Sequence, residues 1–219
     1  MDEREVLEFL KAQKKPVLLD YLEAAFRSMT GRQRRDVFGD AVLKPKTKKA
    51  VDADKLLKEI TLFHRDSKQG RYYAPFNVNS KNYMEVPEET DEWCDAFADL
   101  VKRTMEVTAK GDHSRAVAGF AMLYELVQAV DNGDEIIFAE EAGSWMIPAD
   151  EKAWLRAYLT SLAATTMPEA FATAVMPMLR RDSLQSFSAK VYISALKVAN
   201  PQQKVVLQAE IKRKNIRTN

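Results

Sequence analysis

The chain has 219 residues, of which 46% are hydrophobic and 30% charged, and its 33 basic and 32 acidic side chains leave a formal net charge of +1. Frequent apolar residues and a net charge near zero exclude a largely disordered chain. The single cysteine, Cys94, excludes an intramolecular disulfide and a multi-cysteine zinc site. The longest nearly apolar run, residues 116–124, is shorter than the ~20 residues of a membrane span, and the charged first residues do not resemble a signal peptide. We therefore expect a cytoplasmic protein with no membrane partner.

The first part of the chain, residues 1–43, is predicted to form a small subdomain of three helices. Apolar residues recur at helical spacing in residues 2–13 and again after Pro16, a residue that suits the first turn of a helix. Thr30 begins a capping-box pattern, which predicts the start of the third helix.

A segment without apolar periodicity, residues 44–49, follows and is interpreted as a solvated linker. The main helical domain is then expected over residues 52–219, because the helical spacing of apolar residues resumes there. Capping residues and prolines predict the starts of seven further helices, at or just after Asp52, Pro87, Asp112, Pro148, Pro168, Asp182 and Pro201. The fold class is therefore all-α, with about ten helices. Short connections favour antiparallel pairs, arranged as an irregular bundle or an α–α superhelix.

The first long interruption of the helical pattern is residues 71–86, which is rich in tyrosine and asparagine. One interpretation is that its aromatic side chains hold the segment against the helices, because burial of aromatic rings contributes much apolar contact. The other is a binding surface, for which the candidate residues are Tyr72, Tyr73, Phe76, Asn79 and Tyr83.

The second interruption, residues 131–148, is predicted to contain a short β-hairpin near 135–147. Short apolar runs at 136–138 and 144–147 flank a turn, which is typical of paired strands. Its candidate binding residues are Glu140, Glu141 and Trp145. The acidic residues lack the spacing of a calcium loop, so we interpret them as a solvated acidic edge and expect no metal site.

The sequence contains no recognisable catalytic motif. It lacks a glycine-rich phosphate loop, a nucleophile elbow and a His-Glu-x-x-His helix. His64 and His113 have no carboxylate at ligand spacing on their own predicted helices. We therefore assign no catalytic residue and no cofactor. An enzyme stays open as an alternative in which distant residues converge near Glu140, Glu141 and His64.

Charge is unevenly distributed along the chain. Residues 27–49 hold eight basic and two acidic side chains, whereas residues 116–151 hold eight acidic side chains and no lysine or arginine. This pattern favours self-association into a homo-oligomer. The basic segment also suggests an alternative function, a nucleic-acid-associated module, because lysine and arginine bind phosphates. Its candidate residues are Arg32, Arg34, Arg35, Lys46, Lys48 and Lys49.

Four segments, residues 72–76, 86–88, 111–113 and 138–145, resemble an uncharacterised bacterial all-helical family, and the similarity covers about residues 56–180. Relatives in that family include proteins with SWIM-type zinc fingers, but the cysteine and histidine set of such a finger is absent here. The resemblance implies an all-helical bacterial protein without an assigned activity. Together with the missing motifs, it leads us to expect a non-enzymatic, helical scaffold or interaction module that binds a protein partner.

Overall fold

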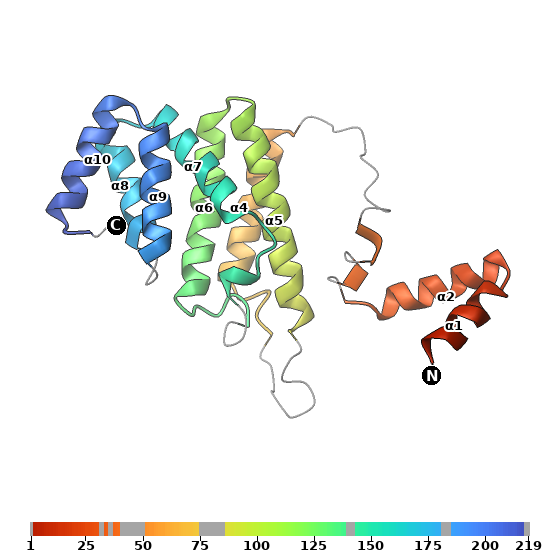
Figure 1. The fold of residues 1–219 in the computed structure, drawn as a ribbon. Helices are drawn as coiled ribbons and strands as arrows, with labels where there is room; N and C mark the ends of the chain where they lie inside the picture. Colours follow the sequence, from red (N-terminus) through yellow and green to blue (C-terminus); the bar gives the residue numbers. More distant parts are fainter. Residues whose placement is uncertain are drawn as a thin grey trace. The chain divides into compact units, whose positions relative to one another are not determined.

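A computed structural model describes residues 2–30, 33–34, 37–39, 51–74, 86–138, 143–180 and 185–216, and for residues 3, 180 and 185–189 it describes the backbone alone. Over these ranges the chain is all-α and contains no strand (Figure 1). It divides into two compact units, Met1–Lys48 and Lys49–Asn219. None of the described helices is both long enough and apolar enough to cross a bilayer.

Within its described residues, the N-terminal unit contains the helices α1 (Glu3–Lys11) and α2 (Lys15–Ser28), and residues 33–34 and 37–39 are also helical. The Asp2 carboxylate caps α1 by accepting a hydrogen bond from the Arg4 amide, and α2 has a proline in its first turn. The capping box at Thr30 is confirmed, because the Thr30 amide donates to the Gln33 side chain and the Gln33 amide to the Thr30 hydroxyl. Most of the predicted third helix lies outside the described residues.

The larger unit contains seven α-helices and one 3-10 helix within its described residues. Acidic or asparagine N-caps explain several of the starts: Asp52, Asp112, Asp150 and Asn200 each accept a hydrogen bond from a backbone amide of the first turn. Asp52 and Asp112 are among the starts predicted from the sequence. The elements are α4 (Ala53–Lys68), α5 (Glu88–Ala109), α6 (His113–Asp131), η1 (Ser144–Met146), α7 (Glu151–Thr165), α8 (Pro168–Arg180), α9 (Gln185–Val198) and α10 (Pro201–Arg213).

Two glycines that the sequence places after helices end them in the left-handed region. Gly70 follows α4 with φ +73°, and Gly111 follows α5 with φ +84°. A side chain with a Cβ is strained at these angles, so glycine suits both positions. In contrast, Pro177 does not end its helix, because α8 continues to Arg180.

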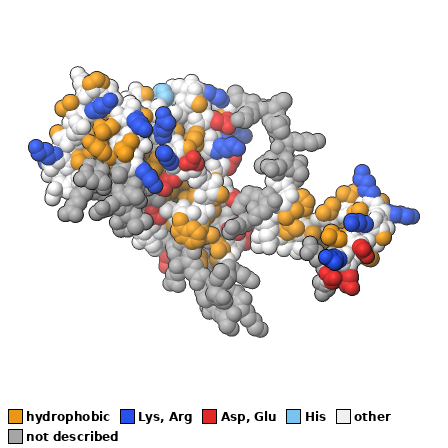
Figure 2. All heavy atoms as spheres, in the orientation of Figure 1, with side chains coloured by type: hydrophobic (Ala, Val, Ile, Leu, Met, Phe, Trp, Pro, Cys, Tyr) orange, Lys and Arg blue, Asp and Glu red, His pale blue; other side chains and the backbone are white. Residues whose placement is uncertain are grey.

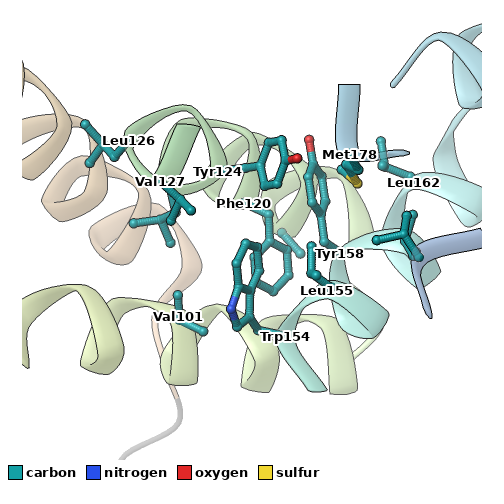
Figure 3. Packing of buried hydrophobic residues seen from close by; sticks show 14 of the residues in the cluster. Val101, Phe120, Tyr124, Leu126, Val127, Trp154, Leu155, Tyr158, Leu162 and Met178 are labelled. Atoms are coloured by element: carbon teal, nitrogen blue, oxygen red, sulfur yellow. The ribbon is translucent and has the colours of Figure 1, made fainter. Parts of the chain in front are cut away.

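The core of the larger unit is continuous from α4 to α10. Helix α6 packs against α4, α5 and α7, whereas α8 packs against α9 and α10. Aromatic rings fill the centre, and Phe120, Tyr124, Trp154 and Tyr158 lie together in Figure 3. The Phe120 ring centroid is 6.3 Å from that of Trp154 and 5.4 Å from that of Tyr158, so the rings tie α6 to α7.

The predicted β-hairpin near 135–147 is wrong for the described part of that segment. Residues 135–137 form a turn and a bend, and residues 144–146 form the 3-10 helix η1. The successive side chains Ile136, Ile137 and Phe138 are all buried, whereas an edge strand would alternate buried and exposed positions. The Phe138 amide donates to the Thr90 hydroxyl of α5 at 3.3 Å, so a helix side chain takes the place of a strand partner. Residues 139–142 lie outside the described residues.

Candidate functional site

The two interruptions predicted from the sequence begin next to each other in the structure. An added Cβ at Gly70, just after α4, would lie 3.7 Å from the carbonyl oxygen of Glu135, just after α6. On the same side, the Lys68 ammonium is 3.6 Å from carboxylate oxygens of both Glu125 and Asp134. We call this region, residues 64–74, 90–93 and 132–138, the loop end of the larger unit.

At the loop end, Tyr72 extends the aromatic core. Its ring centroid is 5.5 Å from that of Phe63, which in turn is 5.7 Å from Trp93. Burial raises the pKa of the Tyr72 hydroxyl above its usual value. Tyr73 is half-buried, and its amide closes a turn by donating to the Gly70 carbonyl. Tyr72 therefore matches the interpretation in which aromatic side chains hold the segment in place; Phe76, Asn79 and Tyr83 lie outside the described residues.

A buried polar network joins α4 to α5 at the same end. The Trp93 indole donates to the Ser67 hydroxyl at 2.9 Å, and this hydroxyl donates to the Phe63 carbonyl at 2.8 Å. The Asp66 carboxylate accepts from Arg65 at 2.8 Å and from Arg71 at 2.7 Å, and these hydrogen bonds lower the pKa of Asp66 below its usual value. Each of these groups is satisfied within the fold, which indicates a structural role.

His64 gains a carboxylate partner that local spacing did not reveal. Its Nε2 lies 3.1 Å from a carboxylate oxygen of Glu125 on α6, 61 positions later in the chain. Glu140 and Glu141 lie outside the described residues, so their predicted convergence on His64 stays a prediction. Among the described side chains there is no group of three or more histidine, cysteine or acidic residues that could hold a metal ion.

His113 and Ser161 form a pair that resembles a nucleophile and its base but is inaccessible. The His113 Nδ1 is 3.2 Å from the Ser161 hydroxyl, which is also 3.0 Å from the Thr108 hydroxyl. Ser161 is fully buried, so no substrate can reach its oxygen in this fold. The pair instead links the start of α6 to α7.

Trp145, a predicted binding residue, is 78% exposed on η1, and Gly143 lies against its ring. Figure 2 shows a hydrophobic patch over η1, whose place in the fold is seen in Figure 1. Exposed apolar patches mark interaction surfaces when they are large. The role of Trp145 in binding stays a prediction.

Arg34 is the one member of the predicted basic patch that the structure describes. Its guanidinium lies over the Phe26 ring, 5.0 Å from the centroid, and donates to the Phe26 carbonyl at 2.9 Å. Arg34 thus closes the end of α2 within its own unit. Arg32, Arg35, Lys46, Lys48 and Lys49 lie outside the described residues.

An apolar groove that the sequence did not reveal lies between the starts of α8 and α10. It has a volume of about 520 Å³ and is open to solvent. Two of its side chains are unusually exposed for apolar residues, Met167 at 74% and Val205 at 67%. We call it the α8–α10 groove; it is lined by Met167, Pro168, Glu169, Pro201, Gln202, Val205 and Val206.

A buried glutamine, Gln203, holds the two sides of this groove together. Its Oε1 accepts from the Asn200 amide at 2.9 Å, which completes the capping box of α10. Its Nε2 donates to the carbonyls of Ala163 at 3.0 Å and Thr166 at 2.9 Å, just before α8. The sequence predicts a helix start at Pro201, but nothing local predicts the partners of Gln203, which lie 37 and 40 positions earlier in the chain.

Comparison of the chain with protein-family models, with curated proteins and with solved structures found no match. The family resemblance therefore stays a prediction.

Proposed function

We propose that this protein is a non-enzymatic helical module that binds a short segment of a partner protein in the α8–α10 groove. The observation that carries the proposal is the pair of exposed apolar side chains, Met167 and Val205, beside a groove walled by two prolines. When a partner covers large apolar side chains that were exposed to water beside a concavity, the free energy of the system falls, and this favours binding.

The lining suits an apolar segment of protein. Pro168 and Pro201 lack amide hydrogens and begin their helices, so they form rigid walls that offer no donor to a polar ligand. Met167 can change rotamer to fit different partner side chains. Glu169 is exposed on the rim and makes no ion pair with any other described residue. The favoured partner is therefore an apolar segment with a lysine or arginine beside its anchoring residue.

The packing of the helices supports a binding module rather than an enzyme. Contacts run from α6 to α7, from α7 to α9, from α9 to α8 and from α8 to α10, and we propose that these helices form an irregular stack of antiparallel pairs. Grooves between neighbouring helices are common sites for peptides. The polar clusters described above, at Asp66, Ser67 and Ser161, are satisfied internally and serve the fold.

The experiment is a selection of displayed random peptides on the intact protein, followed by affinity measurements on variants. Val205→Glu and Met167→Glu place a carboxylate in the groove and should each weaken binding by about tenfold or more. Ile193→Glu is the matched control, because Ile193 is an exposed apolar residue, 52% accessible, on α9 outside the groove. The control should bind like the parent.

A second readout tests the charge preference. Enriched peptides should carry a basic residue beside an apolar anchor, and Glu169→Gln should weaken their binding at low salt more than at high salt. The proposal is wrong if no peptide is enriched. It is also wrong if Ile193→Glu reduces binding as much as Val205→Glu does.

A further inference from the structure

The N-terminal unit leaves a row of large apolar side chains partly uncovered. Leu19, Leu22 and Phe26 of α2 are 54%, 50% and 42% exposed, although the Phe26 ring also contacts the Phe38 ring and the Arg34 guanidinium. Met29 continues the row at the end of the helix and is half-buried. The four residues are spaced three, four and three positions apart, which is the spacing of a coiled-coil seam. We call this row the α2 seam.

Helix α1 does not cover the seam. The Phe9 and Tyr21 rings, 6.1 Å apart, join α1 to a different side of α2. Tyr21 lies about 160° around the helix from Leu19, given 3.6 residues per turn. Neither α1 nor α2 buries a described side chain completely. The hairpin therefore has an apolar surface suited to another helix but too little core of its own.

The charges of the hairpin select its partner. Residues 2–8 hold four acidic and one basic side chain, whereas the connection at residues 11–15 holds three lysines. These two segments lie at opposite ends of α1. A second hairpin related by a two-fold axis across α2 would place each acidic end beside a basic end. The charges are thus complementary between two copies of the same chain.

We infer that the α2 seam pairs with the α2 seam of a second copy of this chain, in antiparallel orientation, and forms a four-helix bundle from two hairpins. Two helical hairpins joined in this way bury a shared core that neither forms alone. The inference is independent of the α8–α10 groove, which lies in the other unit.

The test combines sedimentation of the intact protein with thiol cross-linking. The parent protein should sediment as a dimer, and Leu22→Glu should raise the dissociation constant of the dimer about tenfold or more. High salt should also weaken the dimer, because the charged ends are exposed. Ala24→Glu is the matched control: Ala24 is exposed on α2, outside the seam, and this variant should stay dimeric.

Cross-linking reports the orientation. Leu19→Cys, Leu22→Cys, Phe26→Cys and the control Ala24→Cys are each treated with copper phenanthroline, which oxidises two facing thiols to a disulfide. Cys94 is buried and should not react. In an antiparallel pair only the seam position nearest the two-fold axis should cross-link strongly. A monomeric parent, equal cross-linking of Ala24→Cys, or strong cross-linking at all three seam positions would overturn the inference.

Discussion

Replacing Gln203 with leucine tests how α10 is held against the end of α7. Leucine is similar in size but has no polar atoms, so the variant loses the hydrogen bond from Asn200 and both hydrogen bonds to the carbonyls of Ala163 and Thr166. Each such bond contributes about 1 kcal/mol net, and a buried carbonyl left without a donor costs about 1–3 kcal/mol. We expect a loss of about 3–5 kcal/mol in the free energy of unfolding.

In a unit of this size, that loss lowers the melting temperature by roughly 10 °C. The measurements are urea unfolding followed by circular dichroism, and calorimetry. Gln208→Leu is the matched control, because Gln208 is exposed on the same helix, and it should change the stability by less than about 1 kcal/mol.

Gln203→Glu adds a test with the opposite electrostatic sign. The carboxylate of this variant would replace the amide donor and face two carbonyl oxygens. Gln203→Glu should therefore destabilise the protein more than Gln203→Leu does at neutral pH, and this destabilisation should decrease at low pH, where the carboxylate is protonated. The reasoning is refuted if Gln203→Leu unfolds within about 1 kcal/mol of Gln208→Leu. Peptide binding in the α8–α10 groove should weaken in Gln203→Leu, because Gln203 holds the two walls in register.

Three further predictions concern the core and its titratable groups. A Cβ at Gly119 would lie 3.0 Å from the Ile60 Cδ1, so Gly119→Val should lower the free energy of unfolding by about 2 kcal/mol or more. Gly119→Ala adds only the Cβ and gains about 1 kcal/mol of helix propensity, so it should change the free energy of unfolding much less. Urea unfolding measures both variants. Burial raises the pKa of Tyr158 to about 12, and the unfolded chain ionises near 10, so stability should fall by about 2–3 kcal/mol between these pH values and fall less in Tyr158→Phe. Arg65 and Arg71 lower the pKa of Asp66, so the contribution of Asp66 to stability is present above its usual pKa and is lost as the pH falls. Asp66→Asn should therefore flatten the acid side of the curve of stability against pH. An unchanged curve would contradict this role of Asp66.

The helices of this protein could be predicted because the signals for them are local. A cap such as Asp52 acts within three residues, and a terminating glycine such as Gly111 acts through its own φ angle. The wrong hairpin shows the limit of such signals. Ile136 and Ile137 form a short apolar run, which fits a strand or any other buried segment equally well, and their contacts with the rest of the core decided against a strand.

The candidate sites depended on contacts between distant parts of the chain. The sequence marked Tyr72 and Trp145 as aromatic residues in irregular segments, but packing partly buried the Tyr72 ring beside Phe63 and left the Trp145 ring exposed. His64 acquired its carboxylate from another helix. The spacing of residues along the chain shows which residues share a face of a helix. It does not show which face of another helix packs against that face.

From the order of its amino acids alone, this chain is helical, free of disulfides and rich in amphipathic segments, because these properties depend on composition and on neighbours a few positions apart. The α8–α10 groove exists only in the folded unit. Met167 and Val205 become neighbours because Gln203 bonds across 37 to 40 positions of chain, and burial of that amide selects one packing of α10 against α7.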